Sequence, residues 1–377
     1  MTPDDLDAVL DVRKRAFGLL SAAEIEAWRA VVGPVLSQGR YLGAFDGTRL
    51  AAAARVRPFT QWWYGRPQPM AGVAGVTVNP EDRGRGVGTT IMKAVVRRAL
   101  DLGDAVSALY PATTPIYRGL GFEHAGAQYS VPLPTEALRT IRPRGQVKLR
   151  RMGPDDAPEL LAILHRVHAA TRASGPIAHS EETLRRILAE PDDFRYIADD
   201  GFVIYGWSDS GIKVDHLVAG SEETARALWS IVGSSSSMAK TVTAHLAPDD
   251  PVRWLLRERS TEQVHETRWM FRVLDVAEAV ARRGFPAEVP LDAVLTVDDP
   301  LLADNSRSWR LEVSGGVGAA VPSVEEGARL TINGLSALYC GVPTSTLRLG
   351  GLMSGDERYD AALDAAFSGR PYMLDYF

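Results

Sequence analysis

The sequence predicts an α+β chain of three domains, in which the first two share one fold. Three observations carry this prediction. A β-branched strand runs through a loop of glycine and arginine into an amphipathic helix at residues 76–101. The helix-start pattern of the first residues returns near residue 153. After residue 268, strands and helices follow one another without regular alternation, and 377 residues suffice for two or three domains.

Composition narrows the function classes. The 42 Lys and Arg against 47 Asp and Glu give a formal net charge of −5, which is not the basic footprint of a nucleic-acid-binding protein. No apolar run reaches the ~20 residues of a membrane helix, and no signal peptide opens the chain. Cys340 is the single cysteine, and the 7 His have no metal-ligand spacing. We therefore expect a cytoplasmic protein with no metal, no nucleic-acid partner and no membrane span.

The first domain opens with a helix start. Thr2 is a capping residue, Pro3 suits the first helical position, and acids fill the first turn. The buried stripe that follows consists of Leu6, Val9, Leu10 and Phe17. Residues 41–47 then predict a strand that ends in a hairpin turn.

The aromatic cluster Trp62-Trp63-Tyr64 precedes the next strand and is expected on a mobile loop or hairpin. Two roles remain open for it. The rings can wall a substrate cleft and hold an ammonium group by cation–π contact, or they can serve packing or an interface.

The segment Val76–Thr90 carries the strongest functional signal. Backbone N–H groups at a helix start point outward, and the helix dipole adds partial positive charge, so this loop is expected to bind a diphosphate. Glycines at 84, 86 and 88 permit close approach, and Arg83 and Arg85 add cationic donors. No Gly-Lys-Ser/Thr ending of a Walker loop follows, and the spacing G-x-G-x-x-G of a Rossmann turn is absent. The alternative is an ordinary surface turn.

The sequence after the loop strengthens the functional interpretation. A helical stripe contains Ile91, Met92, Val95, Val96, Ala99 and Leu100. Gly103 is placed to end this helix, and residues 105–110 predict a buried strand. Tyr117 follows, with Gly121-Phe122 four residues later.

A strand, an Arg83-x-x-Gly86-x-Gly88 loop, a helix, a strand and Tyr117-x-x-x-Gly121-Phe122, in this order, resemble the GCN5-related N-acetyltransferases (GNAT superfamily). The resemblance implies acetyl-CoA as co-substrate. The pantetheine arm would pair with the backbone of Val76, Thr77 and Val78. The diphosphate would be held by Arg83, Gly84, Arg85, Gly86, Val87, Gly88 and Thr89. The pantetheine and thioester would be flanked by Ala112 and Thr113.

The second domain repeats the pattern without the loop. Gly153-Pro154-Asp155-Asp156 restates the helix start, and residues 196–202 restate the strand and hairpin turn. The strand-to-helix junction at 214–224 has one glycine, with Ser221, Glu222 and Glu223 in ordinary capping positions. Because acids at a helix start repel a diphosphate, we expect this domain to keep the fold and lack the cofactor. Chance similarity is the alternative.

The third domain is expected to be α+β. Its predicted strands are Trp269–Val273, Ser308–Val313 and Ala328–Ile332, and its predicted helices are Val276–Arg282 and Asp356–Phe367. A Pro/Arg/Gly stretch at 143–146 suits a linker. The predicted domains are therefore 1–145, 146–268 and 269–377.

Two GNAT-like units and an α+β tail resemble the Eis (enhanced intracellular survival) family, whose third domain is sterol-carrier-protein-like. The resemblance implies direct transfer of acetyl to a primary amine, in an aminoglycoside-like molecule or a lysine, and a homohexamer. Tyr117 matches the family's general acid, which protonates the departing CoA thiolate. Phe377 matches the aromatic last residue, whose carboxylate is the general base. A free α-carboxylate has a pKa near ~3.5, and burial among aromatic rings would raise it.

Alternatives stay open at each position. Tyr117 can be a core residue packed on Phe122, Phe377 can be a hydrophobic anchor, and Asp375 is a rival acid. No acid stands near Phe17–Leu20, where relatives lead one to expect one in the amine pocket, and Glu24 and Glu26 follow with unknown orientation. The competing function is a lipid-binding or scaffold protein with a vestigial transferase, and an acyltransferase of another chain length is not excluded. Titration with acetyl-CoA separates the enzyme from the lipid-binding protein.

Overall fold

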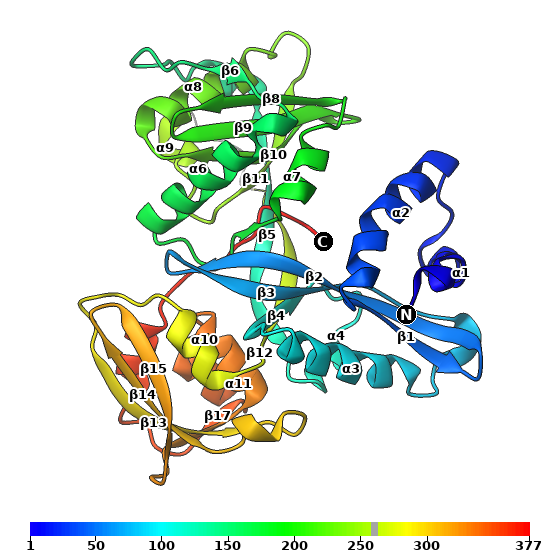
Figure 1. The fold of residues 1–377 in the computed structure, drawn as a ribbon. Helices are drawn as coiled ribbons and strands as arrows, with labels where there is room; N and C mark the ends of the chain where they lie inside the picture. The colour runs from blue at the N-terminus through cyan, green and yellow to red at the C-terminus, as the bar shows by residue number, and fades with distance from the viewer. Residues whose placement is uncertain (258–262) are drawn as a thin grey trace.

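The computed structural model describes residues 1–257 and 263–377 of the chain. Figure 1 shows three bodies, with the first unit on the right, the second above and the third below at the left. One sheet runs through the first two bodies in the order β1-β2-β3-β4-β12-β5-β11-β10-β9-β8-β6, and a separate sheet, β15-β14-β13-β16-β17, forms the third. None of the described helices is both long and apolar enough to cross a membrane.

The first unit supplies the cofactor-loop region. Its helices are α1 (Leu6–Phe17), α2 (Ala22–Ser37), α3 (Val87–Asp101), α4 (Thr114–Arg118) and α5 (Thr135–Arg139). Its strands are β1 (Tyr41–Asp46), β2 (Arg49–Trp63), β3 (Arg66–Val78), β4 (Val106–Leu109) and β5 (Glu123–Pro134). Short 3-10 turns precede α1 and α3, namely η1 (Pro3–Asp5) and η2 (Pro80–Asp82).

The second unit repeats this plan. Its helices are α6 (Ala157–Ala170), α7 (Glu181–Ile187), α8 (Glu222–Gly233) and α9 (Val252–Leu255), and η3 (Pro154–Asp156) precedes α6. Its strands are β6 (Arg150–Arg151), β7 (Ile177–Ala178), β8 (Asp193–Ala198), β9 (Gly201–Ser208), β10 (Gly211–Ala219) and β11 (Thr241–Leu246). The parallel pair β10–β11 with α8 between its strands corresponds to β3–β4 with α3. The predicted repeat is therefore present in the fold.

The remaining elements form the third body, apart from β12 (His265–Val273). The strands are β13 (Leu291–Asp298), β14 (Ser308–Ser314), β15 (Val317–Ser323), β16 (Ala328–Thr331) and β17 (Met353–Ser354). The helices are α10 (Val276–Arg282), α11 (Ile332–Tyr339), α12 (Thr344–Leu349), α13 (Asp360–Ala366) and the turn η4 (Ala303–Asn305). The predicted α+β class is confirmed. The predicted helix Asp356–Phe367 is shorter than expected, because residues 356–359 form a turn before α13.

Strand β12 joins the first sheet and not the third body's sheet. It pairs antiparallel with β4 on one side and with β5 on the other. The predicted boundary between residues 268 and 269 thus falls inside a strand of the large sheet. The domain limits given above stay a prediction.

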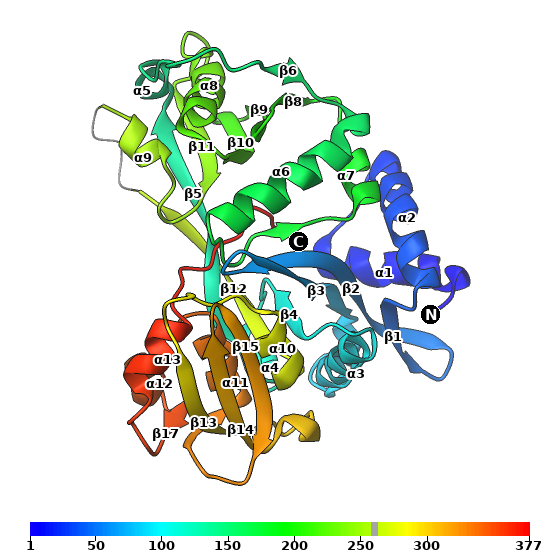
Figure 2. The ribbon, with the colours of Figure 1, turned by 60° about the vertical axis from the view of Figure 1, so that its left-hand side comes forward.

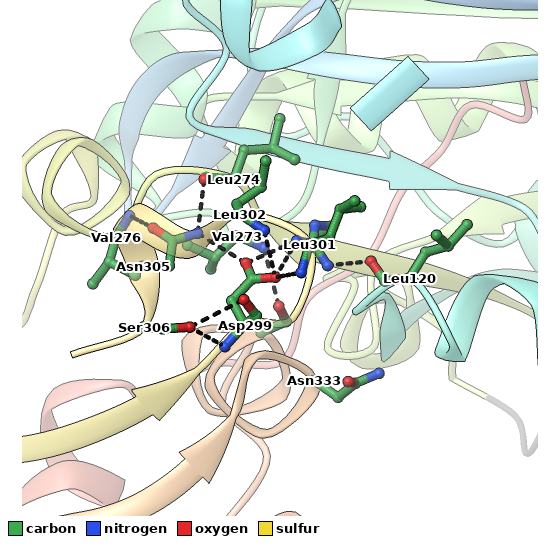
Figure 3. A network of polar contacts seen from close by, with 12 residues as sticks. Leu120, Val273, Leu274, Val276, Asp299, Leu301, Leu302, Asn305, Ser306 and Asn333 are labelled. Carbon is green, nitrogen blue, oxygen red and sulfur yellow. Dashed lines mark hydrogen bonds and ion pairs between the residues drawn. The ribbon is translucent and has the colours of Figure 1, made fainter. Parts of the chain in front are cut away.

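A buried polar network joins the third body to the first (Figure 3). The Arg272 guanidinium on β12 forms a fully buried ion pair with Asp299 at 2.8 Å and donates to the carbonyl oxygen of Leu120. Asn305 Nδ2 donates to Asp299 at 3.0 Å. The pairing of the two charges offsets part of the cost of burying them, although Arg272 Nε has no hydrogen-bond partner among the described residues, and the bond to Leu120 fixes the turn that follows α4.

The aromatic cluster before β3 lies at a hairpin, as one of its two predicted settings has it. Trp62 and Trp63 end β2 and are fully buried, and the hairpin turn lies at residues 64–65. The Trp63 ring packs 5.0 Å from the ring of Phe271 and 5.1 Å from that of Tyr339. Of the two roles left open for the cluster, packing is the one that these two tryptophans fulfil, Trp63 in the core shared with the third body and Trp62 in a core of the second unit.

Candidate active site

Strands β3 and β4 form a fork. They pair in parallel only at Ala71–Gly72 with Ser107–Ala108, although β3 continues to Val78. Beyond Gly72 the edge of β3 that faces β4 has no strand partner among the described residues. An open edge of this kind can pair with the amide groups of an extended ligand.

A β-bulge turns β3 at the fork. The register with β2 shifts between Ala53 and Arg55, so that Gly75 and Val76 together oppose one residue, and Gly75 has φ +60°. A glycine in the left-handed region is typical of such a bulge. Asn79 N donates to Ala51 O, so the backbone of Asn79 points toward β2. Because successive residues of an antiparallel strand point their N–H and C=O groups alternately toward and away from the neighbouring strand, those of Val76 and Val78 point away from β2. These are two of the three residues predicted to pair with pantetheine; the buried Thr77 faces β2 instead.

The loop before α3 offers unoccupied backbone donors. Gly84 and Gly86 have φ +75° and +79°, and a Cβ at either position would point into open space. Gly86 is the N-cap of α3, no side chain caps this helix, and its first turn has no acid. The N–H groups of Val87, Gly88 and Thr89 therefore lie at the positive end of a helix, where an anion binds.

The arginines of the loop have different partners. The Arg85 guanidinium donates to the buried carboxylate of Asp82 at 2.9 Å, and Arg49 donates to the same carboxylate at 2.7 and 2.9 Å. The hydrogen bonds and charges of Arg49 and Arg85 lower the pKa of Asp82. Arg85 thus braces the loop through Asp82, whereas Arg83 is exposed and forms no ion pair or hydrogen bond with any described residue. The sequence alone gave no signal for the role of Asp82.

The equivalent helix of the second unit is closed to an anion. Ser221 is the N-cap of α8, and its side chain accepts a hydrogen bond from the backbone of Thr224. Glu222 and Glu223 occupy the first turn. The capping predicted for these residues is confirmed, and the two helix starts differ in charge and in free donors.

Tyr117 lies on the α3 side of the sheet. It is buried on α4, in one cluster with Ala71 and Val73 of β3, and its ring is 6.3 Å from that of Phe122. Burial raises the pKa of its hydroxyl, which has no hydrogen-bond partner among the described residues. The phenol therefore stays protonated near neutral pH and is free to donate.

The third body holds α4 in place. Asn333 of α11 donates to the carbonyl oxygens of Arg118 and Phe122 at 3.0 and 2.9 Å, so both ends of the turn after Tyr117 are fixed. The predicted residues Ala112 and Thr113 are exposed between β4 and α4, and Thr113 is the N-cap of α4. They thus lie at the mouth of the fork.

The last seven residues dock between the units, and the C-terminus lies near β2 and α7 in both views (Figures 1 and 2). Tyr372 N donates to Ser174 O, and Met373 N donates to Ala127 O. Gln128 Nε2 donates to Leu374 O at 2.6 Å, and the Tyr110 hydroxyl donates to Asp375 O at 2.8 Å. The chain end is therefore tethered by residues of both GNAT-like units.

Phe377 lies on the opposite face of the sheet from Tyr117. Its ring centroid is 4.7 Å from that of Phe59 and 5.6 Å from that of Tyr110. A Cβ on Gly72 would lie 3.0 Å from the Phe377 ring, so the ring rests over the last residue of β3 that pairs with β4. Neighbouring residues of a strand face opposite sides, and Ala71 and Val73 face Tyr117.

Asp375 binds two histidines that sequence reasoning did not single out. Its Oδ1 lies 3.2 Å from His179 Nε2 and 3.1 Å from His216 Nε2. Burial alone would raise the pKa of Asp375, but the charges and hydrogen bonds of His216 and His179 hold it well below its usual range. Burial opposes a charged His216, yet Asp375 leaves the pKa of that imidazole raised. Asp375 is thus a fixed carboxylate and a poor proton acceptor.

The fork of the second unit is where the tail crosses. Strands β10 and β11 pair only at Ile212–Val214 with Val242–Ala244, and His216 follows the pairing on β10. A cavity of about 270 Å³ beyond the pairing is lined by Leu217, Ala219, Trp229, Tyr372 and Leu374, among others. Residues of the tail therefore form part of the wall of the fork that lacks a cofactor loop.

Comparison with known proteins gives the same domain order. Residues 1–125 match a family described as an acetyltransferase (GNAT) domain, residues 164–273 match a second family of that description, and residues 276–374 match a sterol carrier protein domain.

The similarity to known proteins covers most of the chain. A crystal structure of a GCN5-related N-acetyltransferase from Kribbella flavida is 46% identical, has a TM-score of 0.98, and covers 100% of this chain and 97% of its own. An uncharacterized N-acetyltransferase of Streptomyces avermitilis is 28% identical over 100% of this chain and 99% of its own length. N-acetyltransferase Eis of Mycobacterium tuberculosis is 26% identical over 80% of this chain and 78% of its own.

Proposed function

The chain belongs to the GCN5-related N-acetyltransferases, with the domain order of their Eis branch, and from this premise we propose that it transfers acetyl from acetyl-CoA directly to a primary amine. We propose Tyr117 as the general acid and the terminal carboxylate of Phe377 as the general base. The proposal rests on one observation: Tyr117 and Phe377 lie on opposite faces of the sheet at the fork between β3 and β4.

The arrangement suits the two proton transfers. The amine nitrogen forms a bond to the thioester carbonyl carbon while the bond from that carbon to sulfur breaks. The Phe377 carboxylate accepts the proton that the amine loses, and the Tyr117 hydroxyl gives a proton to the departing sulfur. A phenol and a thiol have ordinary pKa values of about 10 and about 8.5, which are close enough for useful transfer.

The residues around the fork fit the co-substrate. The uncapped start of α3, with space in front of Gly84 and Gly86, suits the diphosphate. The outward backbone groups of Val76 and Val78 suit the amides of pantetheine. Bound acetyl-CoA supplies the activated acyl carbon, and Ala112 and Thr113 flank its entry.

The acceptor class follows from the family. Aminoglycoside-like amines and lysine side chains are the first candidates, and the test is a panel of amines assayed for CoA release together with mass detection of the acetylated product. Acetylation of no amine in the panel, with intact acetyl-CoA binding, would contradict the proposal.

We also propose that the protein forms a homo-oligomer, and the family resemblance favours a hexamer. The edge strand β15 of the third body exposes Val317 and Val321, and Val324 beyond it is fully exposed. An exposed apolar sheet edge is typical of an assembly surface. Light scattering coupled to size-exclusion chromatography tests this, and a monomer at all concentrations would contradict it.

A further inference from the structure

Two arginines share the face of β2 on which the chain end lies. Even-numbered residues of this strand pack beneath α3, whereas Phe59 packs against Phe377. Arg55 and Arg57 have the same parity as Phe59 and so lie on its face. This is the side from which an acceptor amine has to reach the Phe377 carboxylate.

Arg57 lies close to the reacting groups. It faces Gly72 in the β2–β3 register, and Gly72 is the residue beneath the Phe377 ring. Its guanidinium carbon is 4.9 Å from the centre of the Phe59 ring, which is in turn 4.7 Å from the Phe377 ring. An acceptor whose amine meets the terminal carboxylate therefore has its remaining groups within reach of Arg57.

Neither guanidinium group has a direct ion-pair partner among the described residues. Each side chain is partly buried, and neither forms an ion pair or hydrogen bond with any described residue; Arg55 Nε is fully buried without a partner. Burial, followed by the charge of Arg55, lowers the pKa of Arg57 to about 10. Arg13 of α1 adds a further positive charge that acts on Arg55. Partly desolvated cations without partners are costly, and an anion would offset that cost.

The nearby acids among the described residues form no ion pair with these arginines, although the charge of Asp375 partly opposes the lowering of the Arg57 pKa. Asp375 is held by His179 and His216. Glu24, one of the acids considered for the amine pocket, instead accepts a hydrogen bond from the backbone of Ser21 at 2.7 Å in a capping box at the start of α2. A polycation approaching the chain end would meet the terminal carboxylate together with two arginines that have no ion-pair partner among the described residues.

We propose that the acceptor is a primary amine that also carries a carboxylate or phosphate, and that Arg55 and Arg57 bind this anionic group. The inference rests on the proposed acetyl transfer and narrows its acceptors to amines that carry an anionic group. Free lysine has this chemistry, whereas a purely cationic aminoglycoside does not. A guanidinium forks onto both oxygens of a carboxylate or phosphate, which would also orient the amine.

The test uses acceptors that share one amine and differ in charge. γ-Aminobutyrate, aminobutanol and putrescine are compared by CoA release, with phosphoethanolamine and ethanolamine as the phosphate arm. The wild-type protein should show kcat/KM for each anionic amine about ten- to a hundredfold above its neutral counterpart, with putrescine lowest. Arg55→Gln and Arg57→Gln should lose this preference, because kcat/KM should fall much more for each anionic amine than for its neutral counterpart. Arg329→Gln, an exposed arginine of β16, is the control and should keep the preference.

Three outcomes overturn the proposal. The first is a wild-type preference for putrescine, a comparison that needs no variant to fold. The second is an equal loss for all acceptors in both variants, because the arginines would then serve the chain end. The third concerns binding. If no amine is acetylated, the proposed transfer itself fails, and the inference is then decided by a binding measurement. Butyrate titrated calorimetrically in the presence of CoA should then bind wild type more tightly than Arg57→Gln, and equal binding would overturn the inference.

Discussion

The ring of Phe377 rests over Gly72, the residue at which β3 last pairs with β4 before the two strands separate. A strand residue without a side chain is what allows an aromatic ring to lie against the sheet here. The position of the chain end therefore depends on a glycine more than 300 residues away in the sequence, and on the fork that begins there.

Gly72→Ala should displace the chain end. The added Cβ would overlap the Phe59 ring and lie 3.0 Å from that of Phe377, so one ring has to move. We expect kcat to fall at least tenfold, because small misplacements of a reacting group cost about a hundredfold. The Kd for acetyl-CoA, measured by calorimetry, should stay the same. Gly47→Ala, in the exposed β1–β2 turn, tests for a general glycine effect, and equal kcat losses would contradict the prediction.

Deleting Phe377, or adding residues after it, should abolish turnover without unfolding the protein. Loss of a general base typically costs 10²- to 10⁴-fold in rate, about the reduction expected in kcat. Phe377→Leu retains the carboxylate and should keep more activity than the deletion. Full activity of a C-terminally tagged protein would remove the terminal carboxylate from the mechanism.

Tyr117→Phe should lower kcat by about 10²- to 10⁴-fold and leave acetyl-CoA affinity unchanged. Burial raises the pKa of the hydroxyl above its usual 10, so the wild-type acid stays protonated and its ionisation should not reduce the rate between pH 6 and 9. The measurement is a pH profile of kcat beside calorimetric binding. A parallel loss of rate and affinity would indicate that Tyr117 is structural.

Docking of the tail should weaken at alkaline pH. The pKa of His216 is raised in the fold, so its contribution is complete below about pH 6.5 and is lost as pH rises through the raised value. The pKa of Asp375 is lowered, so its contribution is complete above about pH 4 and is lost only in acid.

Hydrogen exchange of the Tyr372 and Met373 amides, corrected for intrinsic rates, measures this docking. Protection should be highest between about pH 4 and 6.5 and decline above that window. His216→Gln should remove the alkaline decline, whereas His265→Gln, on an exposed residue of β12, should retain it. The same slope in wild type and His216→Gln would contradict the assignment.

Asp299→Asn should destabilise the protein strongly. It leaves the Arg272 guanidinium buried without its counter-charge, a change that typically costs about 3–5 kcal/mol. Chemical denaturation should show this loss. Asp292→Asn breaks the exposed pair with Arg310 and should change stability little. Comparable midpoints for the two variants would mean that the buried pair is not needed for stability.

Local signals predicted part of the site. The loop at 84–88 could be predicted because glycines, a preceding strand and a following helix are neighbours in sequence. The capping at Ser221 could be predicted for the same reason. A glycine inside a strand, Gly75, is the kind of signal that indicates a bulge, and it was available in the sequence.

Contacts between distant segments could not be predicted. The burial of Trp63 depends on Phe271 and Tyr339, which lie on β12 and α11. The pairing of Asp375 with His179 and His216 depends on where the tail crosses the second unit. The contact of Asp82 with Arg49 of β2, which accompanies its contact with Arg85 in the loop, likewise joins segments that are distant in sequence.

The position of β12 between β4 and β5 has a consequence for how the chain folds during synthesis. The first unit cannot close its sheet until residue 273 has been made, by which time all of the second unit has been synthesised. Until then, β4 and β5 each present an unpaired edge next to a finished neighbour. A fragment ending near residue 145 would keep those edges permanently and should aggregate, so the unit that carries the cofactor loop is not an independent folding unit.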